Sequence, residues 1–341
     1  MRIALDAMGG DFAPGPIVQG ALQAVQKDPD MHVVLVGDQT QIEPLLASAG
    51  AVRDRLEVFH AGQVITMEES PAMAFRKKPD NSISRCWQLM SQHKVDAIVG
   101  AGNTGAMVAC GFLLRLFLKG VRRPGIAALM PTQQGLSILL DVGANVHPKP
   151  EHLYQYGVMG SLYAKQILQR DKPKIALLNV GSEEDKGNEL SKDAAELFRA
   201  SALKDQFIGN IEGRDIHKGV CEVIVTEGFV GNVVLKVCEG VFEFVMKVVG
   251  KEVLSTLKTE VPLGQLALQN IIKRYDHNEL GGAPLLGVDG ICMICHGSSK
   301  ERAIENALHG AAKHARAKLN ELIVKELAAG LPKSGAGEPG A

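Results

Sequence analysis

The sequence lacks an excess of charge of either sign, a long apolar run and a large aromatic content, and each lack removes a class of protein. Its 341 residues carry a formal net charge of −1, and 4% of them are aromatic. A balanced charge gives no reason to expect a nucleic-acid partner. The longest apolar run, residues 108–118, includes Arg115 and is too short to cross a bilayer. The hydrophobic share of 46% is nevertheless large enough for a sizeable core.

Cysteine is also scarce, which bears on the compartment and on cofactors. The six cysteines are scattered and no signal peptide is visible, so we expect reduced thiols and a cytoplasmic protein. The run CMICH at 292–296 matches a c-type haem attachment pattern. It lies in an apolar segment predicted as a strand, and no second pair of ligands has the spacing of a zinc site. We therefore expect neither a metal nor any other cofactor.

Short apolar segments alternate with segments of helical period along the whole chain. The predicted strands are 2–7, 32–37, 56–60, 95–100, 125–130, 136–141, 174–180, 207–212, 222–227 and 290–295. The predicted helices are 16–27, 40–49, 69–78, 82–93, 104–118, 151–169, 188–204, 231–249 and 299–328. This alternation predicts a doubly wound α/β sheet in three layers, with ligands at the carboxyl ends of the strands. No repeat or linker is evident, so we expect one domain over 1–330 and a disordered tail over 331–341.

The glycine-rich run GAGNTG at 100–105 stands between a predicted buried strand and a predicted buried helix. In that setting, free backbone N–H groups and the helix dipole hold an anion. A dinucleotide site also needs an acidic residue about 20 positions later, and no Asp or Glu occurs from 106 to 140. Arg122 and Arg123 leave open an NADP-dependent hydroxy-acid dehydrogenase. Phosphate is the guest that the pattern favours.

Several other polar turns follow predicted strands. They are DAMGGD at 6–11, DVGAN at 141–145, NVGSEEDKG at 179–187 and EGFVGN at 227–232. Any single turn of this composition is ordinary loop chemistry. Together they gather amide donors, Asn side chains and a Lys, with no evident nucleophile. That set is suited to positioning an oxyanion against an activated carbonyl group.

The combination of motifs resembles the bacterial PlsX family of phosphate acyltransferases. The resemblance rests on DAMGGD, GAGNTGA at 100–106, NVGSEEDKGNE at 179–189, GFVGN at 228–232 and GGAPLLGVDG at 281–290, and extends to about residue 310. It implies transfer of a long acyl chain from acyl carrier protein to inorganic phosphate, which feeds phospholipid synthesis. It also implies a homodimer with a fold related to isopropylmalate dehydrogenase and phosphotransacetylase. Glu227 departs from the Asp usual in the family.

The residues and the resemblance both favour Lys186 and Asn232 as the catalytic pair. A Lys before a glycine is otherwise a solvated charge, and Asn232 is otherwise a helix cap. His296 either lines the site or is structural. The predicted substrate-binding residues are Asp6, Gly9, Gly10, Gly102, Asn103, Thr104, Asn145, Gly181, Gly231 and His296.

Residues 251–280 predict a helical hairpin that turns at 262–264, with basic residues beside its apolar faces. Such a hairpin packs in a dimer, contacts a membrane surface, or does both with different faces. The predicted membrane tip is Leu254, Leu257, Leu263, Leu268 and Ile272. We expect a peripheral protein that meets the membrane or a membrane-bound glycerol-phosphate acyltransferase.

A basic triplet is the predicted docking surface for an acidic carrier protein. It consists of Arg76, Lys77 and Lys78, although such triplets are commonly only solvated. A scaffold that binds the carrier or the membrane without catalysis is the remaining alternative.

Overall fold

The computed structural model describes residues 1–257, 259–275 and 281–329, and its central element is one sheet of eleven strands. The strand order is β3-β2-β1-β4-β11-β10-β5-β6-β9-β7-β8. The strands are β1 (Arg2–Asp6), β2 (His32–Gly37), β3 (Leu56–His60), β4 (Ala97–Gly100), β5 (Gly125–Thr132), β6 (Gly135–Leu140), β7 (Ile175–Asn179), β8 (Phe207–Glu212), β9 (Val223–Val225), β10 (Ala283–Leu286) and β11 (Ile291–Ile294).

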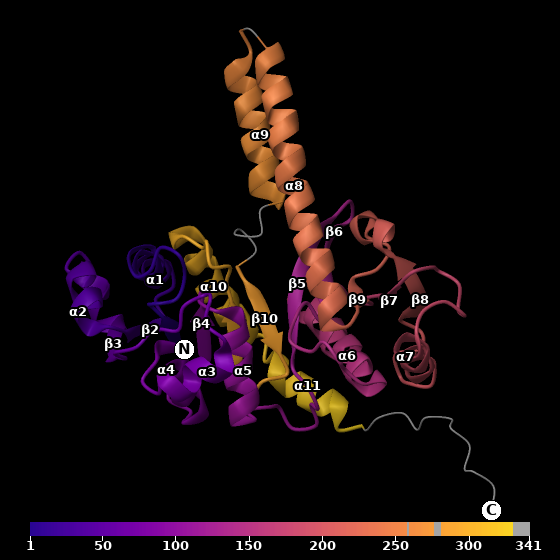
Figure 1. Ribbon diagram of the computed structural model, residues 1–341, viewed down its shortest axis with the longest axis horizontal. Helices are drawn as coiled ribbons and strands as arrows, with labels where there is room; N and C mark the ends of the chain where they lie inside the picture. Colours follow the sequence, from indigo (N-terminus) through magenta and orange to yellow (C-terminus); the bar gives the residue numbers. More distant parts are fainter. Residues whose placement is uncertain (258, 276–280, 330–341) are drawn as a thin grey trace, which may run out of the picture.

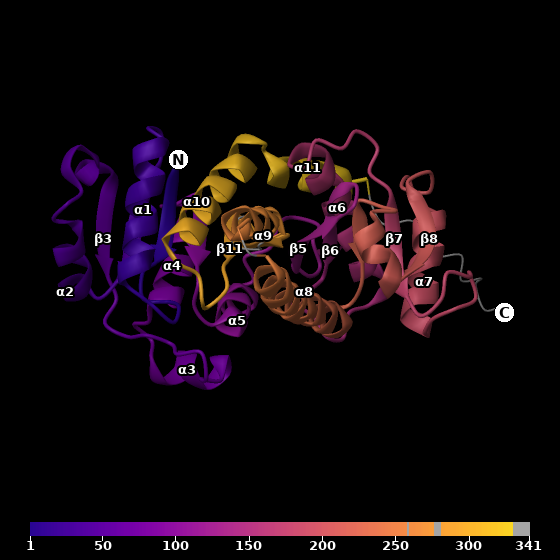
Figure 2. The same ribbon diagram turned by 90° about the horizontal axis from the view of Figure 1, so that it is seen from above.

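Helices cover both faces of this sheet. The α-helices are α1 (Gly15–Lys27), α2 (Gln39–Ile42), α3 (Pro71–Lys77), α4 (Ser82–Ser91), α5 (Thr104–Leu114), α6 (Pro150–Gln166), α7 (Glu189–Arg199), α8 (Gly228–Thr256), α9 (Val261–Tyr275), α10 (Glu301–Arg316) and α11 (Leu319–Leu327). Short 3-10 helices are η1 (Glu43–Leu46), η2 (Gly50–Arg55) and η3 (Gly213–Lys218). Seen from above, α1, α10, α11 and α6 lie on one side of the sheet, and α3, α5 and α8 lie on the other (Figure 2).

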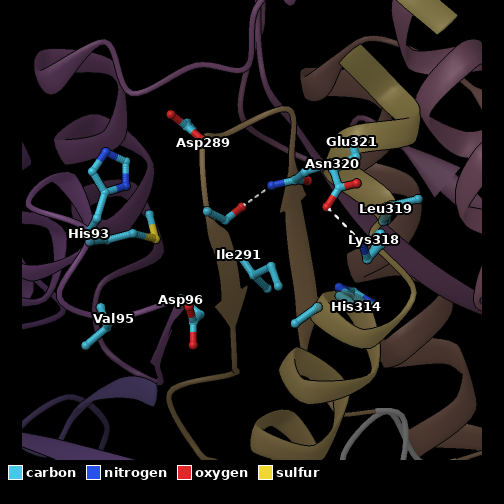
Figure 3. Close-up of a pocket in the computed structure, with 13 residues that line it drawn as sticks. His93, Val95, Asp96, Asp289, Ile291, His314, Lys318, Leu319, Asn320 and Glu321 are labelled. Carbon is cyan, nitrogen blue, oxygen red and sulfur yellow. Dashed lines mark hydrogen bonds and ion pairs between the residues drawn. The ribbon is translucent and has the colours of Figure 1, made fainter. Parts of the chain in front are cut away.

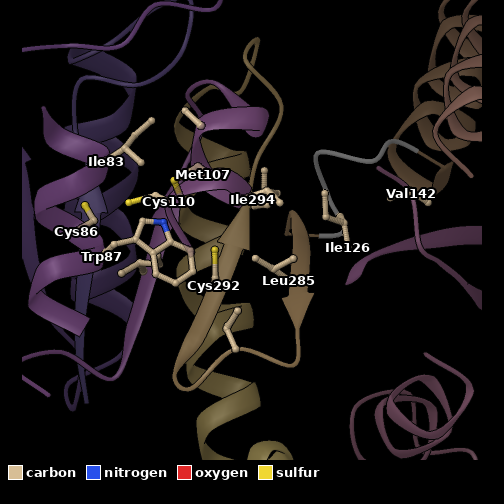
Figure 4. Packing of buried hydrophobic residues seen from close by; sticks show 14 of the residues in the cluster. Ile83, Cys86, Trp87, Met107, Cys110, Ile126, Val142, Leu285, Cys292 and Ile294 are labelled. Atoms are coloured by element: carbon tan, nitrogen blue, oxygen red, sulfur yellow. The ribbon is translucent and has the colours of Figure 1, made fainter. Parts of the chain in front are cut away.

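The buried core follows these layers. One apolar cluster runs along a whole face of the sheet, from Trp87 and Met107 in the first half to Ile224 in the second. Figure 4 shows part of it, from Trp87 to Val142. The other face carries two clusters, one under α1 and α10 and one under α6 and α7. Strands buried on both faces are apolar along their length, as the sequence shows. The three layers confirm the predicted α/β fold class.

The two halves of the sheet run in opposite directions. Strands β1, β2, β3, β4 and β11 are parallel to one another, and so are β6, β9, β7 and β8. Strand β10 is antiparallel to both β11 and β5, and β5 is antiparallel to β6. The last pairing follows from the tight turn at 133–134, because a two-residue connection joins only antiparallel strands. The carboxyl ends of the two halves therefore lie at opposite edges of the sheet.

Several elements differ from the prediction. The strand β10 was not predicted, since its four residues between glycines carry no alternation. The predicted helix 299–328 is two helices, because Lys318 adopts a left-handed backbone with φ of 52° between α10 and α11. The predicted helix 40–49 is the short helix α2 followed by the 3-10 helix η1.

The predicted hairpin exists, but its turn lies elsewhere. Helix α8 continues without a break from Gly228 to Thr256, and α9 begins at Val261. The connection between the helices therefore falls between Thr256 and Val261, and Pro262 lies in the first turn of α9, where its missing N–H costs nothing. The two helices project side by side beyond the sheet (Figure 1). Lys258, residues 276–280 and the predicted tail lie outside the described residues.

The cysteine pair of the CMICH run is divided by the sheet. Cys292 packs into the cluster with Trp87, whereas Cys295 packs into the cluster on the opposite face. One porphyrin cannot bridge two thiols on opposite faces of a strand, so the haem pattern is accidental. Among the described residues, no helix is long and apolar enough to cross a bilayer, and no three His, Cys, Asp or Glu side chains gather as a metal site would need.

Candidate active site

The sheet topology sorts the predicted site residues into two groups. Neighbouring parallel strands β6, β9 and β7 place their carboxyl ends side by side, so the turns 141–145, 226–232 and 179–187 share one edge. We call this edge the second-half edge. Strands β1, β4 and β11 bring Asp6, Gly102 and His296 to the other edge, which we call the first-half edge. A single site assembled from all these turns within one chain is therefore not what the fold builds.

Asp141 organises the turn after β6. Its Oδ1 accepts hydrogen bonds from the backbone N–H of Ile126, Gly143 and Ala144 at 2.9–3.1 Å, and its Oδ2 accepts one from the N–H of Asn145 at 2.7 Å. Burial raises the pKa of the Asp141 carboxyl, and the backbone donors oppose that shift. This carboxylate is fully used by the protein and is structural.

Asn145 completes the same buried network. Its Nδ2 donates to the carbonyl oxygen of Pro124 and to the hydroxyl of Tyr156, both at 2.7 Å, and lies 3.3 Å from Asp141 Oδ2. The side chain is 9% exposed. The amide predicted to bind substrate therefore spends its donors inside the protein.

Helix α8 begins directly above this network. Glu227 caps it, since its carboxylate accepts the N–H groups of Phe229 and Val230 at 2.6 and 2.8 Å. Gly231 lies against the carbonyl oxygen of Asp141, and a Cβ there would overlap that oxygen. A glycine at this position therefore lets the first turn of α8 sit on the turn after β6.

Asn232 is exposed and lies beside the same turn. A Cβ placed on Gly143 would be 3.8 Å from the Cβ and Cγ of Asn232. Because Glu227 fills the N-cap position, the alternative that Asn232 is the cap is wrong. Within the described part of the chain, no hydrogen bond holds the Asn232 amide, which leaves its donor open to a ligand.

Lys186 lies on the neighbouring turn after β7. Its backbone is fixed, because its carbonyl accepts from Asn179 Nδ2 at 3.2 Å and its N–H donates to the Glu183 carbonyl at 3.2 Å. Gly181 faces its aliphatic stem, since a Cβ there would lie 2.9 Å from Lys186 Cγ. The side chain is exposed, and no carboxylate among the described residues lies within 4.0 Å of its ammonium group. Lys186 is thus a positioned cation without a protein counter-ion.

Asp6 at the first-half edge is buried, with 1% exposure. Its Oδ1 accepts from the N–H of Met8 at 3.1 Å, and no described residue donates to its Oδ2. A Cβ on Gly9 would lie 2.5 Å from that oxygen and 2.7 Å from the backbone nitrogen of Gly102. Glycine at position 9 lets these two turns approach closely. Burial raises the pKa of the Asp6 carboxyl.

Asn103 caps α5 and holds a neighbouring loop. Its Oδ1 accepts from Ala106 N–H at 2.9 Å, and its Nδ2 donates to carbonyl oxygens of Thr66, Met67 and Glu69 at 3.0–3.2 Å. Thr104 begins the helix and is exposed. Substrate binding at these residues stays a prediction.

His296 and Gly10 lie on adjoining turns of the same edge. His296 is exposed, with its Nδ1 2.8 Å from the Ser298 hydroxyl. Gly10 lies against the next turn, because a Cβ there would be 3.1 Å from the Gly297 carbonyl oxygen.

The basic triplet is only partly available to a partner. Lys78 forms an ion pair with Glu69 at 2.6 Å and also donates to the Val64 carbonyl at 2.6 Å. Arg76 and Lys77 at the end of α3 are exposed.

The predicted membrane tip is also divided. Leu263 is 67% exposed, whereas Leu254, Leu257 and Leu268 are half-buried between the two helices of the hairpin. Ile272 is 41% exposed and lies further along α9.

A polar pocket of about 280 Å³ lies at the amino ends of β4 and β11 (Figure 3). Two of its polar residues, Asn320 and Asp96, already have partners. Asn320 donates to the carbonyls of Val288 and Gly290 at 3.1 and 2.6 Å, and Asp96 accepts from the N–H of Arg2 at 2.8 Å. This pocket contains none of the predicted site residues.

The second-half edge therefore combines an unpaired cation with an open amide donor on adjacent turns. That pair is suited to holding an anionic nucleophile and stabilising charge on a carbonyl oxygen. Sequence reasoning did not single out Asp141 and Glu227, which set the geometry of these turns. The available signal was the same for both: an acidic residue at the start of a turn can accept hydrogen bonds from the backbone N–H groups of the residues that follow it.

Comparison with known proteins places the chain among enzymes. A family model described as "Fatty acid synthesis protein" matches residues 1–322. A phosphate acyltransferase of Dictyoglomus turgidum is 45% identical over 331 residues, covering 96% of this chain and 98% of the relative. One of Heliobacterium modesticaldum is 49% identical over 312 residues, covering 90% and 92%. A phosphotransacetylase structure from Streptococcus pyogenes has a TM-score of 0.61 at 15% identity, covering 93% and 94%, which confirms the predicted likeness of fold.

Proposed function

Because the chain belongs to the phosphate acyltransferases, an enzyme family of fatty acid and phospholipid synthesis, we propose that it transfers a long acyl chain from acyl carrier protein to inorganic phosphate. Membership of a transferase family disfavours both the NADP-dependent dehydrogenase and the non-catalytic scaffold. The observation that carries the proposal is the pair of uncommitted side chains, Lys186 and Asn232, at adjacent carboxyl strand ends.

In the proposed reaction, a phosphate oxygen attacks the carbonyl carbon of the carrier thioester. A C–O bond forms, the C–S bond breaks, and the carrier thiolate leaves with the electron pair and takes a proton from water. Lys186 holds the phosphate dianion and reduces its repulsion from the developing oxyanion. Asn232 Nδ2 donates to that oxyanion, and a thiolate leaves without needing a strong general acid.

The decisive experiment incubates the purified protein with an acyl carrier thioester and phosphate. We expect free carrier thiol and acyl phosphate to appear in equal amounts. Thiol release that does not depend on phosphate would contradict transfer. A fluorescence titration that detects tight NADP binding would instead support the dehydrogenase.

We propose that the carrier docks near the end of α3. Acyl carrier proteins are acidic, and Arg76 and Lys77 are exposed there. Charge reversal at both residues should raise the KM for the carrier thioester and leave kcat nearly unchanged. An unchanged KM would place the docking surface elsewhere.

We propose that the protein is a homodimer and that the apolar face of α8 contributes to its interface. The exposed apolar residues of that face are Val233, Val237, Val241, Phe244 and Val248. Contiguous apolar surface of this kind on a helix marks an interaction site. Sedimentation should give a dimer for the native chain and a monomer for the double variant Val237→Asp, Phe244→Asp.

We propose that the tip of the hairpin contacts anionic lipid while the protein stays peripheral. Leu263 and Leu266 are 67% and 54% exposed near the start of α9, and a few buried leucines suffice for reversible binding. Leu263→Asp with Leu266→Asp should release the enzyme from liposomes and spare its activity in solution. The Leu268→Asp substitution is a different test, since Leu268 packs within the hairpin. Retention of the first double variant on liposomes would show that the tip is not the anchor.

A further inference from the structure

An apolar cavity of about 800 Å³ lies between the middle of α8, the side of α9 and the far end of β5. Its apolar walls include Leu129, Met130, Phe242, Met246, Ile271 and Ile272. Val245, Ile271 and Ile272 on this wall are 41–44% exposed, so apolar surface faces the opening. A volume of this size is that of a small-molecule site, and its lining favours a hydrocarbon ligand.

The lining residue nearest to Asn232 along the chain is Leu235, about one helical turn further along α8, and the lining continues along that helix away from Asn232. Leu235, Glu239 and Met246 line the cavity and fall on the stripe of α8 that contains Asn232, at spacings of three, seven and fourteen residues. With a rise of about 1.5 Å per residue, Met246 lies about 21 Å from Asn232 along the helix axis. An extended chain of sixteen carbons with bonds of about 1.5 Å is roughly as long.

The charged residues of the lining do not make it an anion site. Glu239 is paired with Lys236 at 2.8 Å, and Glu243 adds a further carboxylate. His217 uses its Nδ1 on the carbonyl oxygen of Pro131 at 2.8 Å. Glu239 and Glu243 are offset by Lys247, which also lines the cavity, and by the His217 imidazole, whose pKa is raised to about 8. The lining therefore has no excess of positive charge to hold a phosphate, and its apolar side chains are the attractive surface.

We propose that this cavity holds the hydrocarbon tail of the acyl substrate, with the thioester at Asn232 and the far end of the chain at Met246. The proposal rests on the proposed function and adds the place where chain length is measured. We propose the acyl chain as the occupant because the cavity runs along α8 away from Asn232 and is about as long as a sixteen-carbon chain. The rival occupant is a second copy of the protein.

The first test compares carrier thioesters with sixteen-carbon and eight-carbon chains. Met246→Trp fills the far end of the cavity, beyond the reach of the shorter chain. We expect kcat/KM to fall about tenfold for the longer chain, as when about two methylenes lose their apolar wall. The shorter chain should keep a rate within about threefold of the native enzyme, since it does not contact the change. Met246→Leu should behave as the native protein.

Gln265→Trp is the matched control, because Gln265 is exposed on α9 and lies outside the cavity lining. This control should leave kcat/KM unchanged for both the sixteen-carbon and the eight-carbon thioester. Equal losses for both chains in Met246→Trp, or no loss for either, would overturn the proposal. A shift of Met246→Trp from dimer to monomer with unchanged chain preference would assign the cavity to a second copy and also overturn it.

The second test needs no catalysis and therefore separates the two proposals. Cys238 lines the cavity, and it is the only one of the six cysteines that is not buried. Its thiol hydrogen-bonds His217, and this contact and the Pro131 carbonyl raise the pKa of that imidazole to about 8. Hexadecylphosphonate should slow alkylation of Cys238 at least about fivefold, whereas butylphosphonate should not, because binding grows with buried methylenes.

Equal alkylation rates with both phosphonates would overturn the cavity assignment even if acyl transfer is observed. Protection by the long phosphonate in a protein that forms no acyl phosphate would contradict the proposed transferase reaction but not the cavity assignment. In that case the cavity remains a site for long alkyl chains. Met246→Trp should remove the protection in the same assay.

Discussion

The turns at the first-half edge and those around Lys186 and Asn232 at the second-half edge treat their polar side chains differently. Asp6 and Asn103 are almost fully buried, and Asn103 spends all its hydrogen bonds on the protein. Lys186 and Asn232 are exposed, and no described residue pairs with either side chain. Similar turns therefore stabilise the structure at the first-half edge and leave polar side chains available to a ligand at the second-half edge. The Asp141–Asn145 network repeats the supporting role beneath Asn232.

The contrast separates stability from catalysis. A buried and paired amide leaves unsatisfied partners behind when it is removed, which costs folding free energy. An exposed and unpaired group contributes little to the free energy of unfolding. Its removal therefore changes binding or kcat only where a ligand contacts it. The contrast predicts which substitutions change kcat and which change unfolding.

Lys186→Ala carries the largest expected effect. Removing the cation should cost about 3 kcal/mol of transition-state stabilisation, which lowers kcat more than a hundredfold. Unfolding in urea should match the native protein, because no carboxylate among the described residues pairs with Lys186. Lys192→Ala, an exposed lysine on α7, is the matched control and should be fully active. A native rate in well-folded Lys186→Ala would remove this residue from the mechanism.

Asn232→Ala should follow, with a loss in kcat of about a hundredfold from one oxyanion donor. Its melting temperature should not change, since Glu227 rather than Asn232 caps α8. Asn232→Asp should be at least as slow, because a carboxylate repels the oxyanion. If a lower melting temperature accounts for the whole loss in Asn232→Ala, the residue is structural.

Asn145→Ala should act mainly on stability. It leaves the Pro124 carbonyl and the Tyr156 hydroxyl without their partner, at a cost of about 2 kcal/mol in the free energy of unfolding. Urea denaturation measures that loss, and kcat at a temperature where the variant stays folded should fall far less than in Asn232→Ala. A large loss of kcat with native stability would instead assign Asn145 a role in substrate binding or catalysis, as for Lys186 and Asn232.

Asp6→Asn should give the smallest effect, and one that depends on pH. The folded pKa of Asp6 lies above its unfolded value of about 3.8, so its contribution is full below that value and is lost as pH rises. The variant should therefore gain stability relative to the native protein as the pH rises above about 4, because the buried carboxyl of Asp6 resists ionisation and an amide does not. A stability difference that stays constant with pH would mean that the folded pKa is unshifted.

The sequence by itself determined the alternation of elements, the α/β class and the glycine turns. These features depend on local patterns: apolar segments bounded by glycine define β1, β4 and β7 with little outside help. It also pointed to the correct enzyme family through several motifs at once. Predictions from the sequence failed where the local signal was weak, as in β10. They also failed where a helix continues through a residue that usually ends helices, as α8 does at Gly250.

Only the tertiary structure decided which polar residues are free and where they meet. The sequence cannot show that Asn145 faces Tyr156 or that Glu227 fills the cap, because those partners are set by chain segments packed far from one another. It also cannot show that the antiparallel pairing of β5 with β6 reverses the second half of the sheet. That reversal sends two sets of similar turns to opposite edges, and it aligns the cavity along α8 with Asn232. The turn at 133–134 sets the β5–β6 pairing locally, but the position of β10 between the two halves, antiparallel to both β11 and β5, is a long-range property that no short motif encodes.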